Sequence, residues 1–144
     1  MESLARICPQ LRDDDVALAA FTLSLSPRLP FLNLVEWGAN RRSRMRGMPY
    51  GDQALCLRRE VFESLGRFPE QPLLEDLELV DEARRRGAVV TLEPCVVSSS
   101  RRWQRHGVIG NTLNNQIVLL GRALGVPAME ICTWYYGADG TKTY

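Results

Sequence analysis

Two neighbouring carboxylates, Glu75 and Asp76, are the residues of this chain best suited to acid–base chemistry. A carboxylate in a cleft can accept the proton of a hydroxyl group while that hydroxyl attacks an electrophile. The pair also stands where a charged helix is expected to begin, and carboxylates there cap free N–H groups and face the positive end of the helix dipole. A structural cap and a catalytic base are both open, and they are compatible because a cap also fixes a carboxylate in place.

A second group with chemical potential, Arg101, Arg102 and Trp103, follows three serines. An arginine pair beside an indole can bind a diphosphate or stack on a sugar or a base. The same three residues also suit an ordinary helix start, with the Trp in the core and both arginines in solvent. A further arginine cluster at residues 41–46 ends another expected helix, where it either complements the helix dipole or binds an anion.

The elements that must position these residues alternate between strands and helices, which indicates an α/β fold. Residues 16–25 have the length and the Val, Phe and Thr content of a buried strand. Shorter strands are expected at residues 54–57 and 88–92, and a separate extended piece at 95–97 after Pro94. Helices are predicted at residues 30–46, 59–65, 75–86, 108–124 and 128–136.

Helical periodicity distinguishes two of these helices. In the helix at 75–86, Leu77, Val80 and Ala83 share one face, which predicts burial. The helix at 108–124 carries a longer apolar stripe, formed by Ile109, Leu113, Ile117, Leu120 and Leu124. This stripe is expected to pack on its own domain. The alternative is a helix lying at a membrane surface, helped by the aromatic residues 134–136.

Composition limits the class of protein. The 144 residues suit one domain, and a net charge of +1 gives no overall electrostatic argument for a nucleic-acid partner. The cysteines at positions 8, 56, 95 and 132 do not have the spacing of a zinc site. No signal peptide or membrane-spanning run is recognised. A reducing, cytoplasmic setting is the expectation, with peripheral membrane association as the less favoured alternative.

The order of these motifs resembles the acceptor-side half of family 2 glycosyltransferases, which have a GT-A-like α/β fold. The family pattern is a Gly turn, an apolar strand, Arg-Arg, a short helix ending in Leu-Gly-Gly-Phe, and Glu-Asp opening a helix that ends in Arg-x-Gly. Residues 51–87 are similar to this pattern. A bacterial-type branch is resembled more narrowly, through Pro-Tyr-Gly-Asp-Gln at 49–53, Ser-x-Arg-Arg-Trp at 99–103 and Asn-Gln at 115–116. The likeness covers roughly residues 14–136.

The resemblance implies a reaction and a role for each matching residue. Asp76 would deprotonate an acceptor hydroxyl, which attacks the anomeric carbon of a nucleotide-sugar with inversion. A divalent metal, Mg or Mn, would stabilise the leaving diphosphate. The residues expected to line the acceptor side are Gly51, Asp52, Gln53 and Glu75. Those expected near the diphosphate and the acceptor are Arg101, Arg102 and Trp103.

The sequence also departs from the family pattern. Arg67 stands where the family often has a second Gly, so the backbone is expected to be less free there. The nucleotide-binding βαβ half and its Asp-x-Asp metal motif are not found. Residues 13–15 are three aspartates, but they precede the strand at 16–25 and are expected to form a turn.

Two interpretations follow. In the first, residues 1–144 are one domain, the C-terminal portion of a glycosyltransferase, and bind nucleotide-sugar poorly unless a separate chain supplies the other half. In the second, the chain is a non-catalytic remnant or interaction module, whose arginine clusters bind a partner or an anionic surface.

Overall fold

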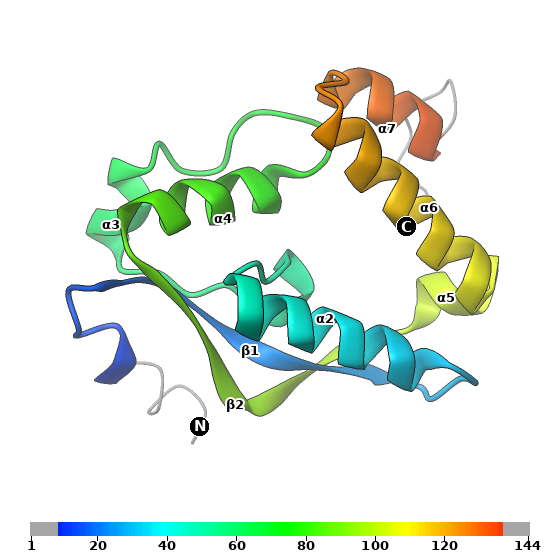
Figure 1. The fold of residues 1–144 in the computed structure, drawn as a ribbon, viewed down its shortest axis with the longest axis horizontal. Coiled ribbons are helices and arrows are strands. Elements are labelled where there is room, and N and C mark those ends of the chain that lie inside the picture. Colours follow the sequence, from blue (N-terminus) through cyan, green and yellow to red (C-terminus); the bar gives the residue numbers. More distant parts are fainter. Residues whose placement is uncertain (1–8, 137–144) are drawn as a thin grey trace.

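The computed structural model describes residues 9–136, which form helices around a two-stranded parallel sheet (Figure 1). Cys8 lies outside the described residues. In chain order the elements are β1 (Val16–Ser26), α2 (Leu32–Arg46), the 3-10 turn η1 (Gly51–Gln53), α3 (Arg59–Ser64), α4 (Glu75–Arg86), β2 (Ala88–Ser99), α5 (Arg101–His106), α6 (Val108–Ala123) and α7 (Ala128–Tyr136). The mixed α/β class and all five helices predicted above are confirmed.

Strand β2 replaces the two separate extended pieces that were expected at 88–92 and 95–97. It pairs with β1 from Ala88 to Ser99, and the register shifts twice: between Val16 and Leu18, and again where Phe21 faces Leu92 while Thr22 faces Cys95. Glu93 and Pro94 are therefore the extra residues at the second irregularity. Proline has no N–H to donate to a strand partner, and such irregular points in a sheet accommodate it.

The edge of β1 opposite β2 is covered by other groups of the same chain. Ala19 exchanges two backbone hydrogen bonds with Cys56, at 2.9 and 2.8 Å, in a single antiparallel bridge. Next along the edge, the side chain of Asn40 accepts from the N–H of Leu23 (2.7 Å) and donates to its carbonyl (3.0 Å). The expected strand at 54–57 is thus reduced to one bridge, because side chains take over the rest of this edge.

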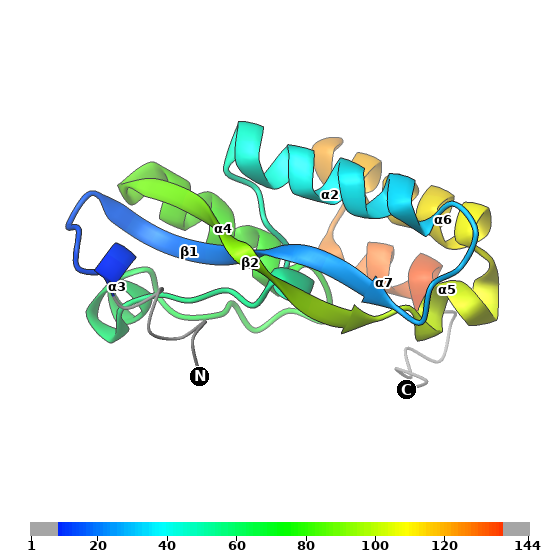
Figure 2. The ribbon, with the colours of Figure 1, turned by 90° about the horizontal axis from the view of Figure 1, so that it is seen from below.

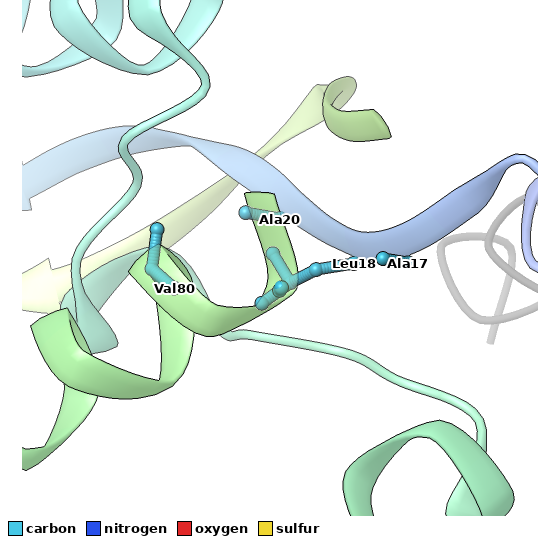
Figure 3. Close-up of a cluster of buried hydrophobic side chains, with 5 residues drawn as sticks. Ala17, Leu18, Ala20 and Val80 are labelled. Carbon is cyan, nitrogen blue, oxygen red and sulfur yellow. The ribbon is translucent and has the colours of Figure 1, made fainter. Parts of the chain in front are cut away.

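The hydrophobic core lies between strand β1 and the two helices that cover it, α4 and α2. Val80 and Ala83 of α4 pack against Ala17, Leu18 and Ala20, as the predicted apolar face required (Figure 3). Helix α2 covers the other end of the strand, where Leu32 and Ala39 meet Leu23 and Leu25. This second cluster also takes in the half-buried Trp103, so the Trp of the Arg-Arg-Trp segment contributes to the core.

The end of α3 explains the departure at Arg67. The N–H of Gly66 bonds to the carbonyl of Glu63 (3.1 Å) and the N–H of Arg67 to that of Phe62 (3.0 Å). This pair of bonds is the Schellman ending of a helix, with Gly66 in the left-handed region at φ 85°. Arg67 is left-handed as well, at φ 65°, which is the conformation that a glycine would adopt with less strain.

The prediction that the apolar stripe of α6 packs on its own domain is wrong. Helix α6 lies at the end of the molecule away from α3, and it packs on α5 and α7 (Figure 2). Its close contact is made by Gly121, where an added Cβ would lie 3.3 Å from Trp134 and 3.4 Å from Ile131. The apolar stripe lies beside this contact and is left exposed. Among residues 9–136, no helix is long and apolar enough to cross a membrane.

Candidate functional site

The first turn of α4 and the turn η1 meet through Asp76. Its Oδ2 accepts a hydrogen bond from the backbone N–H of Gly51 at 2.6 Å. Its Oδ1 accepts from the N–H of Leu77 at 2.9 Å, within the first turn of its own helix. The carboxylate thus contacts a helix-start N–H group and also joins two segments that are 25 residues apart in the chain. Glu75 is half-buried beside it.

Gln53 holds the turn η1 in place. Its side chain is fully buried, donates to the carbonyl of Phe21 on β1 (2.9 Å) and accepts from the N–H of Tyr50 (3.3 Å). Strand β1 therefore holds the turn in place, and the turn positions the N–H of Gly51 that donates to Asp76. Gly51 and Asp52 are exposed, so these two residues form the accessible side of the turn.

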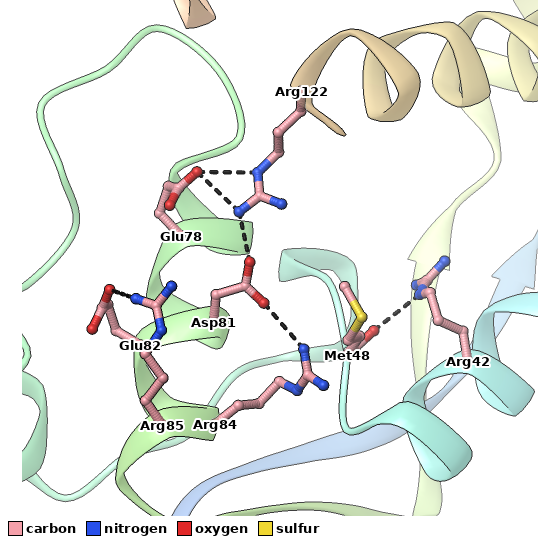
Figure 4. Close-up of polar contacts among 8 residues, drawn as sticks. All are labelled: Arg42, Met48, Glu78, Asp81, Glu82, Arg84, Arg85 and Arg122. Carbon is pink, nitrogen blue, oxygen red and sulfur yellow. Dashed lines mark hydrogen bonds and ion pairs between the residues drawn. The ribbon is translucent and has the colours of Figure 1, made fainter. Parts of the chain in front are cut away.

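Arg42 of α2 joins this group, although the sequence singled it out only as one of a cluster. Its guanidinium carbon lies 3.4 Å from the centre of the Tyr50 ring. Its Nε donates to the carbonyl of Met48 at 2.9 Å (Figure 4). A cation over an aromatic face is an attractive arrangement. The signal in the sequence was proximity, since the arginines at 41–46 directly precede the turn.

The charges of this group interact. Although Asp52 as a residue is exposed, burial of its carboxyl raises its pKa, Arg42 opposes that rise, and Asp76 adds to it. Burial also raises the pKa of Tyr50, again against the effect of Arg42. Burial lowers the pKa of Arg42, and Tyr50, Asp52 and Asp76 counteract this. Two carboxylates, a phenol and one guanidinium from three segments therefore form one electrostatic unit, which we call the Asp76 cluster.

Two further acids of α4, Glu78 and Asp81, have structural partners. Arg122 at the end of α6 bonds to Glu78 (3.0 Å) and to Asp81 (2.6 Å), which ties α6 to α4 (Figure 4). Burial lowers the pKa of Arg122, but the hydrogen bonds to Asp81 and Glu78 outweigh it, and the net shift is upward. Arg84 reaches Asp81 at 3.3 Å. These carboxylates are committed to ion pairs, whereas Asp76 faces the exposed turn.

Metal ligands are not gathered here. Within the part of the chain that the structure describes, no group of three His, Cys, Asp or Glu side chains could hold a metal ion. Asp52 and Asp76 alone do not fit a divalent cation, because Arg42 already places a positive charge beside them. The aspartates at 13–15 lie in the expected turn before β1, where Asp14 pairs with Arg58 at 2.6 Å.

The Arg101–Trp103 group lies elsewhere. Arg101 and Arg102 are exposed on α5, and Arg102 donates to the hydroxyl of Tyr135 at 2.9 Å. Helix α5 is at the far end of α6 from the Arg122 contact with α4 (Figure 1). Since α6 has 16 residues, its two ends are about 24 Å apart. Asp76, Gly51 and Asp52 are thus brought together, while Arg101 and Arg102 belong to a second location.

Comparisons with known proteins gave no match, since no protein-family model, curated protein or solved structure is similar to the chain. The function is therefore inferred from the residues and their geometry.

Proposed function

We propose that this chain is the acceptor-side part of an inverting glycosyltransferase of GT-A-like fold, with Asp76 as the catalytic base. The supporting observation is the 2.6 Å hydrogen bond between the N–H of Gly51 and Oδ2 of Asp76. It joins the Gly-Asp-Gln turn to the Glu-Asp helix start, the two motifs that the family resemblance assigns to the acceptor side. Neither motif is specific alone, and their contact in space strengthens the assignment.

In the proposed reaction, the Asp76 carboxylate takes the proton of an acceptor hydroxyl. The oxygen forms a bond to the anomeric carbon of the donor sugar, and the bond from that carbon to the nucleoside diphosphate breaks. Attack opposite the leaving group inverts the configuration. The backbone N–H groups of Gly51 and Leu77, which donate to the Asp76 carboxylate, would hold it in one orientation. Proton transfer requires such positioning.

Binding of the nucleotide would come from outside these 144 residues. The sheet has two strands in the described part of the chain, against the four to six that are usual. A nucleotide-binding half, with its own strands, would complete the sheet and hold the diphosphate. It would also supply the ligands for a divalent metal, whose chemistry would be to neutralise charge on the departing diphosphate.

The proposal is tested by Asp76→Asn in a sugar-transfer assay in which a nucleotide-binding half is supplied. Loss of the base should lower turnover by about 10²- to 10⁴-fold. The matched control, Glu82→Gln in the same helix, changes an acid that pairs with Arg85 and should retain turnover within a few-fold. Circular dichroism should show both variants folded, because the amide of the first variant still offers an oxygen to the N–H of Gly51. Undiminished turnover in Asp76→Asn would show that Asp76 is not the base.

A non-catalytic interaction module is the second candidate function. Arg101, Arg102 and Arg105 are exposed on one short helix, which favours binding of an anionic partner. This candidate predicts that Asp76→Asn leaves partner binding intact. It also predicts that no sugar is transferred by the wild-type chain when the nucleotide-binding half is present.

A further inference from the structure

The outer face of α6 is apolar and uncovered. Five large side chains at helical spacing are between 55% and 74% exposed: Ile109, Leu113, Ile117, Leu120 and Leu124. The buried residues of α6 lie outside the stripe: Asn111 and Val118 are on the other side of the helix, and Gly121 is at the border of the stripe. A periodic stripe of this size on a helix that is otherwise packed marks a surface that another body covers.

Helix α2 adds a second apolar area. Its buried residues Leu32 and Ala39 face the sheet, while Leu34, Trp37 and Met45 are more than 60% exposed. Phe31, just before the helix, is 64% exposed. Figure 2 shows α2 and α6 on the same side of the sheet. An open apolar pocket of about 480 Å³ lies between the loop that precedes α2 and the start of α6, lined by Phe31, Trp103 and Ile109.

The charged side chains of α5 and α6 are all basic. No Asp or Glu occurs between Glu93 and Glu130, a stretch that includes the whole of α5 and α6. Its arginines are exposed at 101, 102 and 105, beside the start of the stripe, whereas Arg122 is neutralised by α4. On α2, the guanidinium of Arg41 lies 5.4 Å from the centre of the Trp37 ring. Apolar side chains are thus accompanied by uncompensated cations.

We propose that the surface formed by α5, α6 and the outer side chains of α2 binds an anionic phospholipid membrane, with α6 lying in the plane of the interface. A helix with a strong apolar face, next to arginines and an exposed Trp, has the composition of an interfacial helix. Anionic headgroups would pair with Arg101, Arg102 and Arg105 while acyl chains cover the stripe. This surface lies apart from the Asp76 cluster, and the proposal does not depend on glycosyl transfer.

Charge complementarity favours a membrane over a second copy of the chain. A two-fold interface places the same patch on both partners. Burying the stripe in this way would leave the arginines of α5 without compensating charge on the paired helices, because α5 and α6 carry no carboxylate. An anionic membrane supplies both the apolar cover and the negative charge.

The test is co-sedimentation of the full chain with vesicles of phosphatidylcholine containing about a third phosphatidylglycerol, compared with pure phosphatidylcholine. Binding should be at least tenfold stronger to the anionic vesicles and should weaken at high salt. The double variant Leu113→Ser/Leu120→Ser should lose binding tenfold or more. Each of Arg101→Gln and Arg105→Gln should weaken it about fivefold, equivalent to about 1 kcal/mol per arginine.

Matched controls separate this surface from general stickiness. Val97→Ser removes an exposed apolar residue from β2, and Arg59→Gln removes an exposed arginine from α3, so both should bind like the wild type. Equal binding to both vesicle types, or full binding by the leucine double variant, would overturn the proposal. A wild-type dimer that the double variant dissociates, without vesicle binding, would overturn it in favour of a self-association interface.

Discussion

Helices α4 and α6 carry similar apolar stripes, and the fold treats them in opposite ways. The stripe of α4 is buried on β1, with Val80 and Ala83 fully inaccessible. The stripe of α6 is exposed along its length, from Ile109 to Leu124. Helical periodicity shows that a face will be covered, but it does not show by what. The apolar face of α4 is covered by β1 of the same chain. We infer that the apolar stripe of α6 is covered by a membrane.

Truncation of one leucine in each helix tests this difference most strongly. Leu79 of α4 is 1% exposed, so Leu79→Ala should lower the free energy of unfolding by about 2–5 kcal/mol. Leu120 of α6 is 59% exposed, so Leu120→Ala should change it by no more than about 0.5 kcal/mol. Urea unfolding followed by circular dichroism measures both. If both variants lost a similar amount of unfolding free energy, the stripe of α6 would be covered within the folded chain, and the difference between α4 and α6 would not hold.

A smaller effect on stability should come from Asp52, in the turn η1 beside the start of α4. The pKa of Asp52 is raised in the folded protein, mainly by burial of its carboxyl. The folded state therefore holds the proton more tightly than the unfolded chain, so Asp52 lowers stability as the pH rises above its ordinary pKa, and the loss is complete above the raised pKa. Asp52→Asn should make the protein more stable at pH 7.

That gain should shrink as the pH falls and vanish below 3.8, the ordinary value for an aspartate, where Asp52 is protonated in both states. Thermal unfolding of both proteins between pH 3 and 8 measures the difference. A difference that does not change with pH would show that the Asp52 carboxyl is as well solvated in the folded protein as in the unfolded chain.

Much of the local structure could be predicted from sequence because its causes are local. Strand β1 is a continuous apolar run, and α4 has acids in its first turn and arginines in its last. The helix end at Gly66 follows from the ability of glycine to adopt the left-handed conformation, whereas Gly87 is extended and passes too close to the carbonyl of Asp15 for a side chain. The predicted strand at 54–57 failed for a reason that lies far away in the sequence. Asn40 and Gln53 bond to β1 with their side chains, and no periodicity reveals such a use of an amide.

The Asp76 cluster was predictable only in part. The order of motifs pointed to Asp76, Gly51 and Asp52, and the structure brings these residues together. Arg42 was missed as an individual because four arginines occur at 41–46, and only the packing of α2 on the sheet selects one of them. The separation of Arg101 and Arg102 from Asp76 also depends on tertiary geometry, namely the direction in which α6 runs.

The central claim, that this chain is one half of a glycosyltransferase, is tested most directly by calorimetric titration with a nucleoside diphosphate and manganese. The isolated chain should show no tight binding, because residues 9–136 hold no group of side chains that could bind manganese. Addition of a nucleotide-binding half should create saturable binding. Tight binding by the isolated chain, or none by the mixture, would contradict the account.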